Sequence, residues 1–398
     1  MPGSAPVYLY AGYERAGAKG ELGLLIADFE LERYFAKWEF NVDHLLCASD
    51  PEPLSMGELL ALADPESERL WRDLRLGYTE TPGHPLLRAE IARGYQTVEP
   101  DHVLVCSGAE EAVFLSLGAI LGPGDHAVVV WPSYQSLHEV ARAAGAEVTL
   151  LALEYEQGWA LDLDRLRAAV RPTTQAIVVN FPHNPTGALP PRSVLEELAA
   201  IAEEAEAWLV SDEVYRLMEL DPGERWPAAV DCSWRALSIN VVTKTYGLGG
   251  LRIGWVASRH AGLLERIAAR KDYTTICNSA PSEILALIAL RAGDRLLERT
   301  MGIVRSNLRE LDGFFAEASD WVEWVPPRAS TMAFPRLRAD VPADELAAEL
   351  VREEGVLLLP GSVYGHPGNH FRLGFGRADL PQALAGLRRY AARHLRFQ

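Results

Sequence analysis

A lysine with the surroundings of a reactive amine occurs at position 244, within the sequence TKTYGLGG at residues 243–250. This glycine-rich segment follows an apolar run, and Arg252 stands eight residues after the lysine. A lysine amine becomes a nucleophile only where its proton can be lost near neutral pH, as in partly desolvated sites that bind carbonyl compounds. A lone lysine is more often a solvated surface group, so this hypothesis depends on the residues around Lys244.

Two further polar groups follow apolar runs that are typical of buried strands. Residues 175–180 (QAIVVN) lead into the turn-forming sequence NPTG at residues 184–187. The run at 207–210 ends in Ser211 and Asp212, which places a carboxylate at the end of a strand where open α/β sheets bind ligands. The structural alternatives are a plain strand-to-helix loop for the first segment and a helix N-cap for Asp212.

The elements that must position these residues form an α/β pattern. Helical segments alternate with short apolar strands between residues 84 and 257, which predicts a mostly parallel seven-stranded sheet covered by helices. The strands are expected at residues 102–106, 126–130, 147–151, 175–180, 207–211, 237–240 and 252–257.

The pattern changes after the sheet. Long helices are expected over roughly residues 282–316 and helices at 343–353 and 380–395, with strands near Trp321, Thr331, Val356 and Phe371. A helix within residues 24–40 is expected to complete this second unit. We therefore expect a large domain over residues 46–285 and a smaller α+β domain formed by residues 1–45 and 286–398.

The order of several short motifs resembles the class I and II aminotransferases, which are pyridoxal-phosphate enzymes of fold type I. The matching residues, in the order of that family, are Tyr78, Gly83, Leu87 with Arg88, the sequence SGAE at 107–110, Tyr134, NPTG at 184–187, Asp212 with Tyr215, Lys244 with Arg252, and Arg372. Each motif alone is weak, but their shared order over most of the chain is specific. The resemblance implies pyridoxal 5'-phosphate as cofactor, bound to Lys244 as a Schiff base.

The resemblance assigns the cofactor's phosphate to the start of a helix expected at 110–121. Ser107, Gly108, Ala109 and Glu110 follow a strand there, so free backbone N–H groups and the positive helix end would meet the anion. A strand-to-helix turn without a ligand is the alternative.

Three other residues are expected at the same phosphate. Thr243 would add a hydroxyl and Arg252 a bidentate cation that lysine cannot copy; alternatively, Arg252 is a surface residue. Tyr78 is implied to reach the phosphate of a second subunit in a homodimer, whereas by itself it would more often be a core residue. Relatives often carry a further phosphate-binding serine where this chain has Val241, so we expect a slightly weaker or differently arranged phosphate site.

The cofactor ring is assigned four residues by the resemblance. Asp212 is expected to face the pyridine nitrogen and keep it protonated, so that the ring withdraws electrons from the α-carbon of the substrate. Tyr134 is expected to stack on the ring, with ordinary core packing as the alternative. Asn184 and Tyr215 are expected to hydrogen-bond the phenolic oxygen.

Arg372 is the expected substrate residue, in the otherwise apolar sequence HFRLG at 370–374. A buried arginine needs an anionic partner, and the α-carboxylate of an amino acid suits it, with Asn184 beside it; a structural salt bridge is the alternative. The implied reaction moves an amino group between an L-amino acid and a 2-oxo acid, with Lys244 as the general base and Asp212 and Tyr215 as its catalytic partners.

The segment at residues 45–53 (LLCASDPEP) leaves a second reaction open. It replaces the glycine-rich substrate loop usual in aminotransferases and, with residues 29–34, resembles enzymes related to capreomycidine synthase, which cyclise an arginine derivative. A cyclase or lyase of that kind is the alternative function, because fold does not fix chemistry. Glu39, Asp50 and Glu52 would then meet a cationic substrate tail, although solvated surface positions are the simpler interpretation.

The amino-acid composition argues against several other classes of function and partner. The 38 basic and 55 acidic residues give a net charge of −17, which argues against nucleic acid or anionic membrane as partner. A regulator that keeps the fold without catalysis is a minor alternative, since only about 75 residues precede Tyr78 and would have to hold a DNA-binding module. Four scattered cysteines indicate neither a metal site nor disulfides. With no signal-peptide pattern and no membrane-length apolar run, we expect a cytoplasmic protein.

Overall fold

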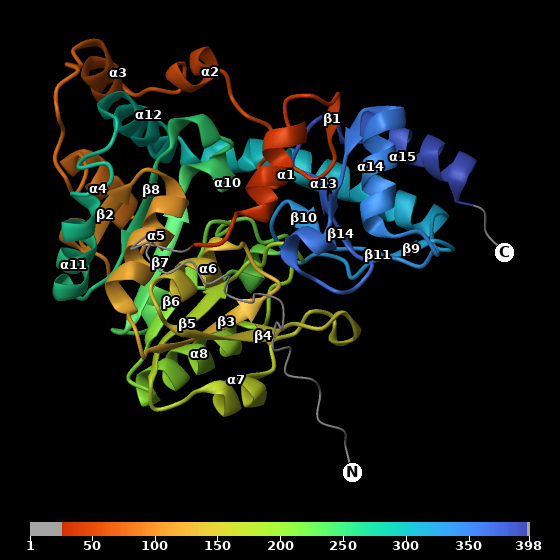
Figure 1. Cartoon of the computed structure of the whole chain (residues 1–398). Helices are drawn as coiled ribbons and strands as arrows, with labels where there is room; N and C mark the ends of the chain where they lie inside the picture. Colours follow the sequence, from red (N-terminus) through yellow and green to blue (C-terminus); the bar gives the residue numbers. More distant parts are fainter. Residues whose placement is uncertain (1–25, 396–398) are drawn as a thin grey trace, which may run out of the picture.

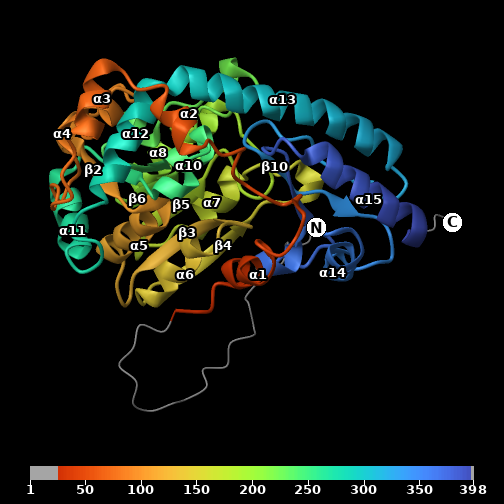
Figure 2. The ribbon, with the colours of Figure 1, turned by 90° about the horizontal axis from the view of Figure 1, so that it is seen from above.

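The centre of the molecule is a seven-stranded sheet (Figures 1 and 2). The computed structural model describes residues 26–395. The strands of the sheet are β2 (Val103–Cys106), β3 (His126–Trp131), β4 (Glu147–Ala152), β5 (Thr174–Asn180), β6 (Trp208–Asp212), β7 (Ala236–Val241) and β8 (Gly254–Ala257). Their order is β2-β8-β7-β6-β5-β3-β4, with β8 antiparallel to both of its neighbours and the other neighbouring pairs parallel. All of the expected strands are confirmed, with ends that differ by one or two residues.

Apart from the edge strand β4, the strands are almost fully buried and mainly apolar, since helices cover both faces of the sheet. Successive side chains of a strand point to opposite faces, so Val128 and Ile177 join one apolar cluster while Ala127 and Ala176 join another. One cluster includes residues of α5 (Gly108–Ile120), α6 (Ser136–Ala143) and α11 (Ala261–Lys271), and the other includes residues of α7 (Leu163–Ala169) and α8 (Arg192–Glu204).

The carboxyl-terminal part forms a second, smaller unit (Figure 1). It contains the three-stranded antiparallel sheet β10-β14-β13, the pair β9 and β11, and the parallel pair of β1 with β12. These strands are β1 (His44–Leu45), β9 (Val322–Glu323), β10 (Met332–Ala333), β11 (Arg336–Leu337), β12 (Val356–Leu357), β13 (Leu359–Pro360) and β14 (Phe371–Gly374). Its helices are α14 (Ala343–Glu354) and α15 (Leu380–His394).

The two units are connected by α12 (Ala280–Arg291) and the long α13 (Gly293–Glu317), which runs from one unit to the other in Figure 2. The remaining α-helices are α1 (Glu30–Trp38), α2 (Met56–Leu60), α3 (Pro65–Arg72), α4 (Pro85–Ala92), α9 (Ala229–Cys232) and α10 (Val242–Tyr246). The division into domains at residues 46–285 stays a proposal; residue 285 lies within α12.

The helix expected within residues 24–40 is shorter than predicted. Residues 24 and 25 lie outside the described part of the chain, and α1 covers only Glu30–Trp38. Its start is set by a contact from another element, since Gln135 accepts a hydrogen bond from the Glu30 backbone N–H at 2.9 Å and donates one to the Asp28 carbonyl at 2.7 Å. Over residues 26–395, no helix combines the length and the apolar character that crossing a membrane requires.

Candidate functional site

The predicted site residues gather at one edge of the central sheet. Asp212 ends β6, Asn184 follows β5, Ser107 follows β2, and Lys244 lies on α10 directly after β7. These strands share one direction, since β2 and β7 are both antiparallel to the intervening β8. Their carboxyl ends therefore meet, as expected for a ligand site in an open α/β sheet.

Lys244 points into the protein. Its Nζ donates a hydrogen bond to Ser49 Oγ at 3.0 Å and lies 5.9 Å from the centre of the Tyr215 ring. Burial lowers the pKa of the Lys244 amine, the Arg372 guanidinium lowers it further, and the Asp50 and Asp212 carboxylates oppose the shift. A lowered pKa raises the fraction of free amine near neutral pH, which a nucleophile or general base requires.

Asp212 is a buried carboxylate, with 6% of its surface exposed. Its Oδ1 accepts a hydrogen bond from the Val214 N–H at 3.3 Å, and no lysine, arginine or histidine nitrogen of residues 26–395 lies within 4.0 Å of it. Burial raises the pKa of Asp212 to about 7, helped by the nearby Glu110 and Glu213 carboxyls. The helix N-cap alternative is wrong, because turns rather than a helix follow β6.

Backbone and side-chain atoms approach each other closely where the phosphate is expected. Gly108 begins α5 with φ +83°, and a Cβ built on it would lie 2.5 Å from Arg252 Nη2. A Cβ on Gly254 would lie 2.7 Å from the carbonyl carbon of Gly108 and 2.8 Å from the Ala109 nitrogen. The first turn of α5, expected from residue 110, begins two residues earlier. Small residues here leave the helix start open to an anion.

The other phosphate candidates differ in burial. Thr243 is buried on α10, and its hydroxyl has no hydrogen-bond partner among the described residues. Arg252 is exposed, as the surface alternative for it required, yet its guanidinium reaches back to the Gly249 carbonyl at 3.2 Å. Val241 is buried in the apolar cluster that contains Tyr215, so it offers no hydroxyl at the place where relatives often have a serine.

Glu110 is hydrogen-bonded to a residue of another helix, α6. Its carboxylate accepts a hydrogen bond from Ser136 Oγ at 3.0 Å, and burial raises its pKa to about 7. The Ser107 N–H donates to Glu111 Oε2 at 2.5 Å. The anion-binding groups at the start of α5 are therefore its free backbone N–H groups rather than its acidic side chains.

Asn184 and Tyr215 supply donors on the side of Lys244. Asn184 Oδ1 accepts hydrogen bonds from the Tyr364 hydroxyl at 3.1 Å and from Arg372 Nη1 at 3.3 Å, while its amide Nδ2 has no hydrogen-bond partner among residues 26–395. The Tyr215 hydroxyl is buried without a hydrogen-bond partner there, and burial raises its pKa. Two donors are thus available to an acceptor oxygen.

Arg372, on β14, is 1% exposed. Its Nε donates to the Cys47 carbonyl at 3.0 Å and its Nη1 to the Tyr364 hydroxyl at 2.6 Å. No carboxylate of residues 26–395 lies within 4.0 Å of it, so the salt-bridge alternative is wrong. A buried guanidinium held by neutral groups is prepared for an anion from outside the chain.

Tyr134 follows β3 and joins α1 to the site. Its ring packs on Phe29, with 5.0 Å between ring centres, and its hydroxyl donates to Glu32 Oε1 at 2.6 Å. The ring is partly buried and packs with residues of both large apolar clusters around the sheet. The described structure therefore contains the packing that the core alternative requires, and stacking on a cofactor stays a prediction.

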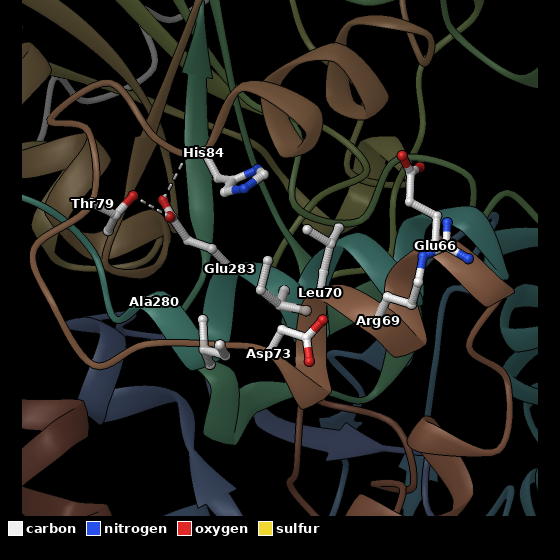
Figure 3. Close-up of a pocket in the computed structure, with 10 residues that line it drawn as sticks. Glu66, Arg69, Leu70, Asp73, Thr79, His84, Ala280 and Glu283 are labelled. Carbon is white, nitrogen blue, oxygen red and sulfur yellow. Dashed lines mark hydrogen bonds between the residues drawn. The ribbon is translucent and has the colours of Figure 1, made fainter.

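Tyr78 is not a core residue, because 92% of its surface is exposed. Its loop is fastened by the buried Glu283, which accepts hydrogen bonds from Thr79 Oγ1 at 2.8 Å and the His84 N–H at 3.3 Å (Figure 3). A cavity of about 420 Å³ lies beside this loop, between α3 and α12. Tyr78 therefore lies on a fixed loop with its ring turned outward.

Three residues of the site lack any signal in the sequence motifs. Ser49 contacts Lys244, Tyr364 contacts both Asn184 and Arg372, and Glu32 contacts Tyr134. Ser49 and Glu32 lie in the segments at 45–53 and 29–34 that resemble the cyclases, but nothing in those segments distinguishes the two residues from their neighbours. The sequence around residue 364 has no link to the motifs.

The set fits pyridoxal 5'-phosphate. The start of α5 and the unpartnered Thr243 hydroxyl suit a phosphate, and the buried Asp212, which forms no ion pair with any residue of 26–395, suits a protonated ring nitrogen. The unpartnered Tyr215 hydroxyl suits the phenolic oxygen, and Lys244 suits the carbonyl carbon.

Comparison with known proteins agrees with a pyridoxal-phosphate site. The family model for aminotransferase class I and II matches residues 46–386. Capreomycidine synthase of Streptomyces vinaceus is 33% identical over 378 residues, which cover 93% of this chain and 94% of that protein. Aspartate/prephenate aminotransferase of Thermus thermophilus is 31% identical over 314 residues, which cover 76% and 79%.

Solved structures of similar proteins share the fold. A pyridoxal-phosphate-dependent aminotransferase from Streptococcus suis superposes with a TM-score of 0.88 at 33% identity, over 93% of this chain and 98% of that one. The pyridoxal-phosphate-dependent cyclase OrfR superposes with a TM-score of 0.85 at 29% identity, over 96% and 100%. The predictions of fold type I and of pyridoxal phosphate as cofactor are confirmed. The chain belongs to the class I and II aminotransferase family of pyridoxal-phosphate-dependent enzymes.

Proposed function

We propose that this enzyme transfers an amino group between an L-amino acid and a 2-oxo acid, with Lys244 as the lysine that binds the cofactor. The observation that carries the proposal is the position of the Lys244 amine. It is directed inward beside Ser49 and Tyr215, and burial, with the Arg372 charge, lowers its pKa.

The cofactor would be held at both ends. Free N–H groups at the start of α5, the Thr243 hydroxyl and the Arg252 guanidinium bind its phosphate. Asp212 binds and keeps the proton on its ring nitrogen, while Asn184 Nδ2 and the Tyr215 hydroxyl donate to its phenolic oxygen. When bound, pyridoxal phosphate supplies an electron sink for the α-carbon of the substrate.

The substrate would be held by Arg372. Its guanidinium, fixed by the Cys47 carbonyl and the Tyr364 hydroxyl, binds the α-carboxylate, with Asn184 beside it. Lys244 would then accept the α-proton at Nζ and give it back to the cofactor carbon within the same half-reaction. Positioned proton transfer of this kind contributes about 10²- to 10⁴-fold in rate.

The test is a panel of amino acids against the purified holoenzyme, followed by absorption spectroscopy and product analysis. Conversion of the cofactor to its amine form, together with release of a 2-oxo acid, supports transamination. Lys244→Ala should lose this conversion while it keeps its fold, as judged by circular dichroism. A product panel without any 2-oxo acid, for every amino acid tried, would refute the proposed reaction.

The active form is proposed to be a homodimer in which Tyr78 reaches the phosphate site of the partner subunit. Support comes from exposed apolar side chains on two neighbouring segments, Leu76 and Tyr78 on one and Tyr273 and Ile276 on the other. Lys271 Nζ joins these segments by a 2.6 Å hydrogen bond to the Thr81 carbonyl. Exposed apolar patches on a rigid surface are typical of subunit interfaces.

Hybrid dimers test whether Tyr78 acts across the interface. A subunit with Tyr78→Ala is mixed with a subunit with Lys244→Ala, each inactive as a homodimer. If Tyr78 serves the partner's site, the hybrid contains one complete site and regains activity. If Tyr78 serves its own subunit, the hybrid contains no complete site and stays inactive, which would refute the proposal.

A cyclase is the second candidate function. Among the curated relatives, capreomycidine synthase covers 93% of this chain and the aspartate/prephenate aminotransferase 76%, whereas the solved structures of the cyclase OrfR and of the Streptococcus suis aminotransferase cover similar shares, 96% and 93%. The residues on one face of α1 favour a cyclase. Glu32 accepts the hydrogen bond from the Tyr134 hydroxyl, and the Arg372 guanidinium lies 5.7 Å from the centre of the Phe35 ring. Glu39, the C-cap residue of α1, continues the same spacing and interacts electrostatically with Lys244. The Glu39 carboxylate is without an ion pair among residues 26–395, and burial with the charges of Asp50 and Glu32 raises its pKa.

The carboxylates of Glu32 and Glu39 would suit a substrate with a cationic side chain, whether the reaction is transamination or cyclisation. Arginine and lysine therefore belong in the substrate panel beside neutral and acidic amino acids. A cyclised or eliminated product, with the cofactor still in its aldehyde form, would establish the second candidate and exclude transamination as the main reaction.

A cytoplasmic location without nucleic acid or membrane partners is also proposed. It is supported by the net charge of −17 and by cysteines that are free in the described structure, two of them buried. Cell fractionation that places the enzyme in a membrane or an exported fraction would contradict it.

A further inference from the structure

The segment that contains Ser49 is fixed to the small unit by its backbone. The Leu46 carbonyl accepts a hydrogen bond from the Gly374 N–H at 2.8 Å, the Cys47 carbonyl accepts one from Arg372 Nε at 3.0 Å, and the Ser49 carbonyl accepts one from Thr331 Oγ1 at 2.6 Å. The packing is close, since a Cβ on Gly374 would lie 1.9 Å from the Ala48 carbonyl oxygen. The backbone at Ser49 therefore has little freedom.

This anchoring does not use the Ser49 side chain. The hydroxyl is directed at Lys244 instead, where its oxygen accepts the 3.0 Å hydrogen bond from Nζ. The same hydroxyl also influences the Tyr215 phenol, although the Tyr215 hydroxyl has no hydrogen-bond partner among residues 26–395: burial raises the pKa of Tyr215, while Arg372 and the Ser49 hydroxyl oppose that shift. A hydroxyl is both donor and acceptor, so Ser49 can accept from the amine and still donate its own proton.

We propose that Ser49 is a catalytic residue that holds the free Lys244 amine during proton transfer. The inference rests on the proposed role of Lys244 as general base. In that step the Cα–H bond of the bound amino acid breaks, a new N–H bond forms at Nζ, and the electron pair stays with the substrate and its cofactor. Ser49 Oγ accepts one amine hydrogen throughout, which directs the nitrogen lone pair toward Cα.

The structure separates this role from a structural one. Ser49→Ala removes the hydroxyl but keeps every backbone contact that fixes the segment, and Ser49→Thr keeps a hydroxyl. Thr331→Val is the matched control, because it removes the donor that anchors the Ser49 backbone and leaves the Ser49 hydroxyl in place. If Ser49→Ala does not fold, Ser49→Cys supplies a similar volume with a weak acceptor.

The first readout uses the cofactor-free protein. Lys244 is modified with an amine-selective acylating reagent over a range of pH, and the extent of reaction is measured on its peptide by mass spectrometry. Since an acceptor stabilises the ammonium form more than the amine, Ser49→Ala should shift the midpoint of labelling to lower pH. Ser49→Thr should restore it toward the wild-type value, and Thr331→Val should leave it near that value.

The second readout is the holoenzyme with an α-deuterated substrate. Loss of one positioning hydrogen bond should lower kcat about three- to tenfold. The isotope effect on kcat should increase and KM should stay within about twofold, because proton transfer then limits the rate. A purely structural role would instead lower stability and cofactor binding and leave the isotope effect unchanged.

The proposed function and the role of Ser49 can be refuted separately. If the cofactor is attached to a lysine other than Lys244, the proposed function is refuted. If it is attached to Lys244, but Ser49→Ala keeps the wild-type labelling midpoint, kcat and isotope effect, only the role of Ser49 is overturned.

Discussion

Asp212→Asn should make the cofactor-free protein more stable at pH 8 and the holoenzyme much less active. Burial raises the pKa of Asp212 to about 7 in the folded chain, against an ordinary value near 3.8. The folded state therefore holds this proton more tightly than the unfolded state between about pH 4 and pH 7.

The sign of the stability effect follows from that difference. Because the folded protein binds more protons in this window, the free energy of unfolding falls as pH rises through it. The difference of about three pKa units corresponds to roughly 4 kcal/mol at about 1.4 kcal/mol per unit. At pH 8 the folded wild type must hold an ionised, buried Asp212, which lowers its free energy of unfolding. Asparagine carries no charge, so the Asp212→Asn variant does not lose stability in this way.

The holoenzyme should respond in the opposite direction. A protonated ring nitrogen pairs with the ionised Asp212, and breaking a buried pair by removing one partner costs about 3–5 kcal/mol. If that cost falls on the transition state, kcat decreases by about 10²- to 10³-fold or more at 1.36 kcal/mol per decade.

The assay is thermal or denaturant unfolding of cofactor-free wild type and Asp212→Asn between pH 5 and pH 8, with kcat of the holoenzymes measured beside it. Asp221→Asn is the matched control, because that carboxylate is exposed and accepts a hydrogen bond from the Gly223 N–H. The difference between variants isolates Asp212 from Glu110, whose pKa is also raised to about 7. Parallel stability curves for wild type and Asp212→Asn would refute the reasoning.

Three further substitutions test other parts of the site. Arg372→Met should lower kcat/KM for amino acids by about 10²-fold or more, because a buried charged hydrogen-bonding group is lost. The kcat/KM for amines that lack a carboxylate should stay unchanged. Steady-state kinetics with both types of substrate measure this difference. Gly108→Ala should weaken cofactor binding severely, because residue 108 has φ +83° and the added Cβ would lie 2.5 Å from Arg252 Nη2. Cofactor affinity is measured by titration followed by absorbance, and an unchanged affinity would show that the prediction is wrong. Glu39→Gln should lower kcat/KM for arginine or lysine about three- to tenfold, in line with a partly buried ion pair, and leave neutral amino acids unaffected; an equal effect on both classes would exclude a role in specificity.

The strands and the motif residues of this fold were predictable from local sequence. Runs such as AVVV at residues 127–130 are buried on both faces, so their apolar character is continuous and their ends are marked by polar or turn-forming residues. Helix boundaries were less predictable. The apolar spacing extends back to Leu24, but α1 begins at Glu30 because Gln135, far away in the chain, caps its start.

The site was predictable only where a residue lies inside a motif. Lys244, Asp212 and Asn184 each follow a strand, and parallel strands bring such positions together without further information. Tyr364 comes from the small unit, and Ser49 lies on the segment before α2 that is hydrogen-bonded to that unit, so both reach the site through packing against β14. No local pattern encodes those contacts, since they depend on how the two units meet.

The central claim is that Lys244 carries the cofactor, and one measurement tests it most directly. The holoenzyme is reduced with borohydride, digested, and searched by mass spectrometry for the peptide that has gained the reduced cofactor. We expect that peptide to contain Lys244, and we expect no labelled peptide from Lys244→Ala. Cofactor fixed on the buried Lys271, or on any lysine other than Lys244, would contradict the account.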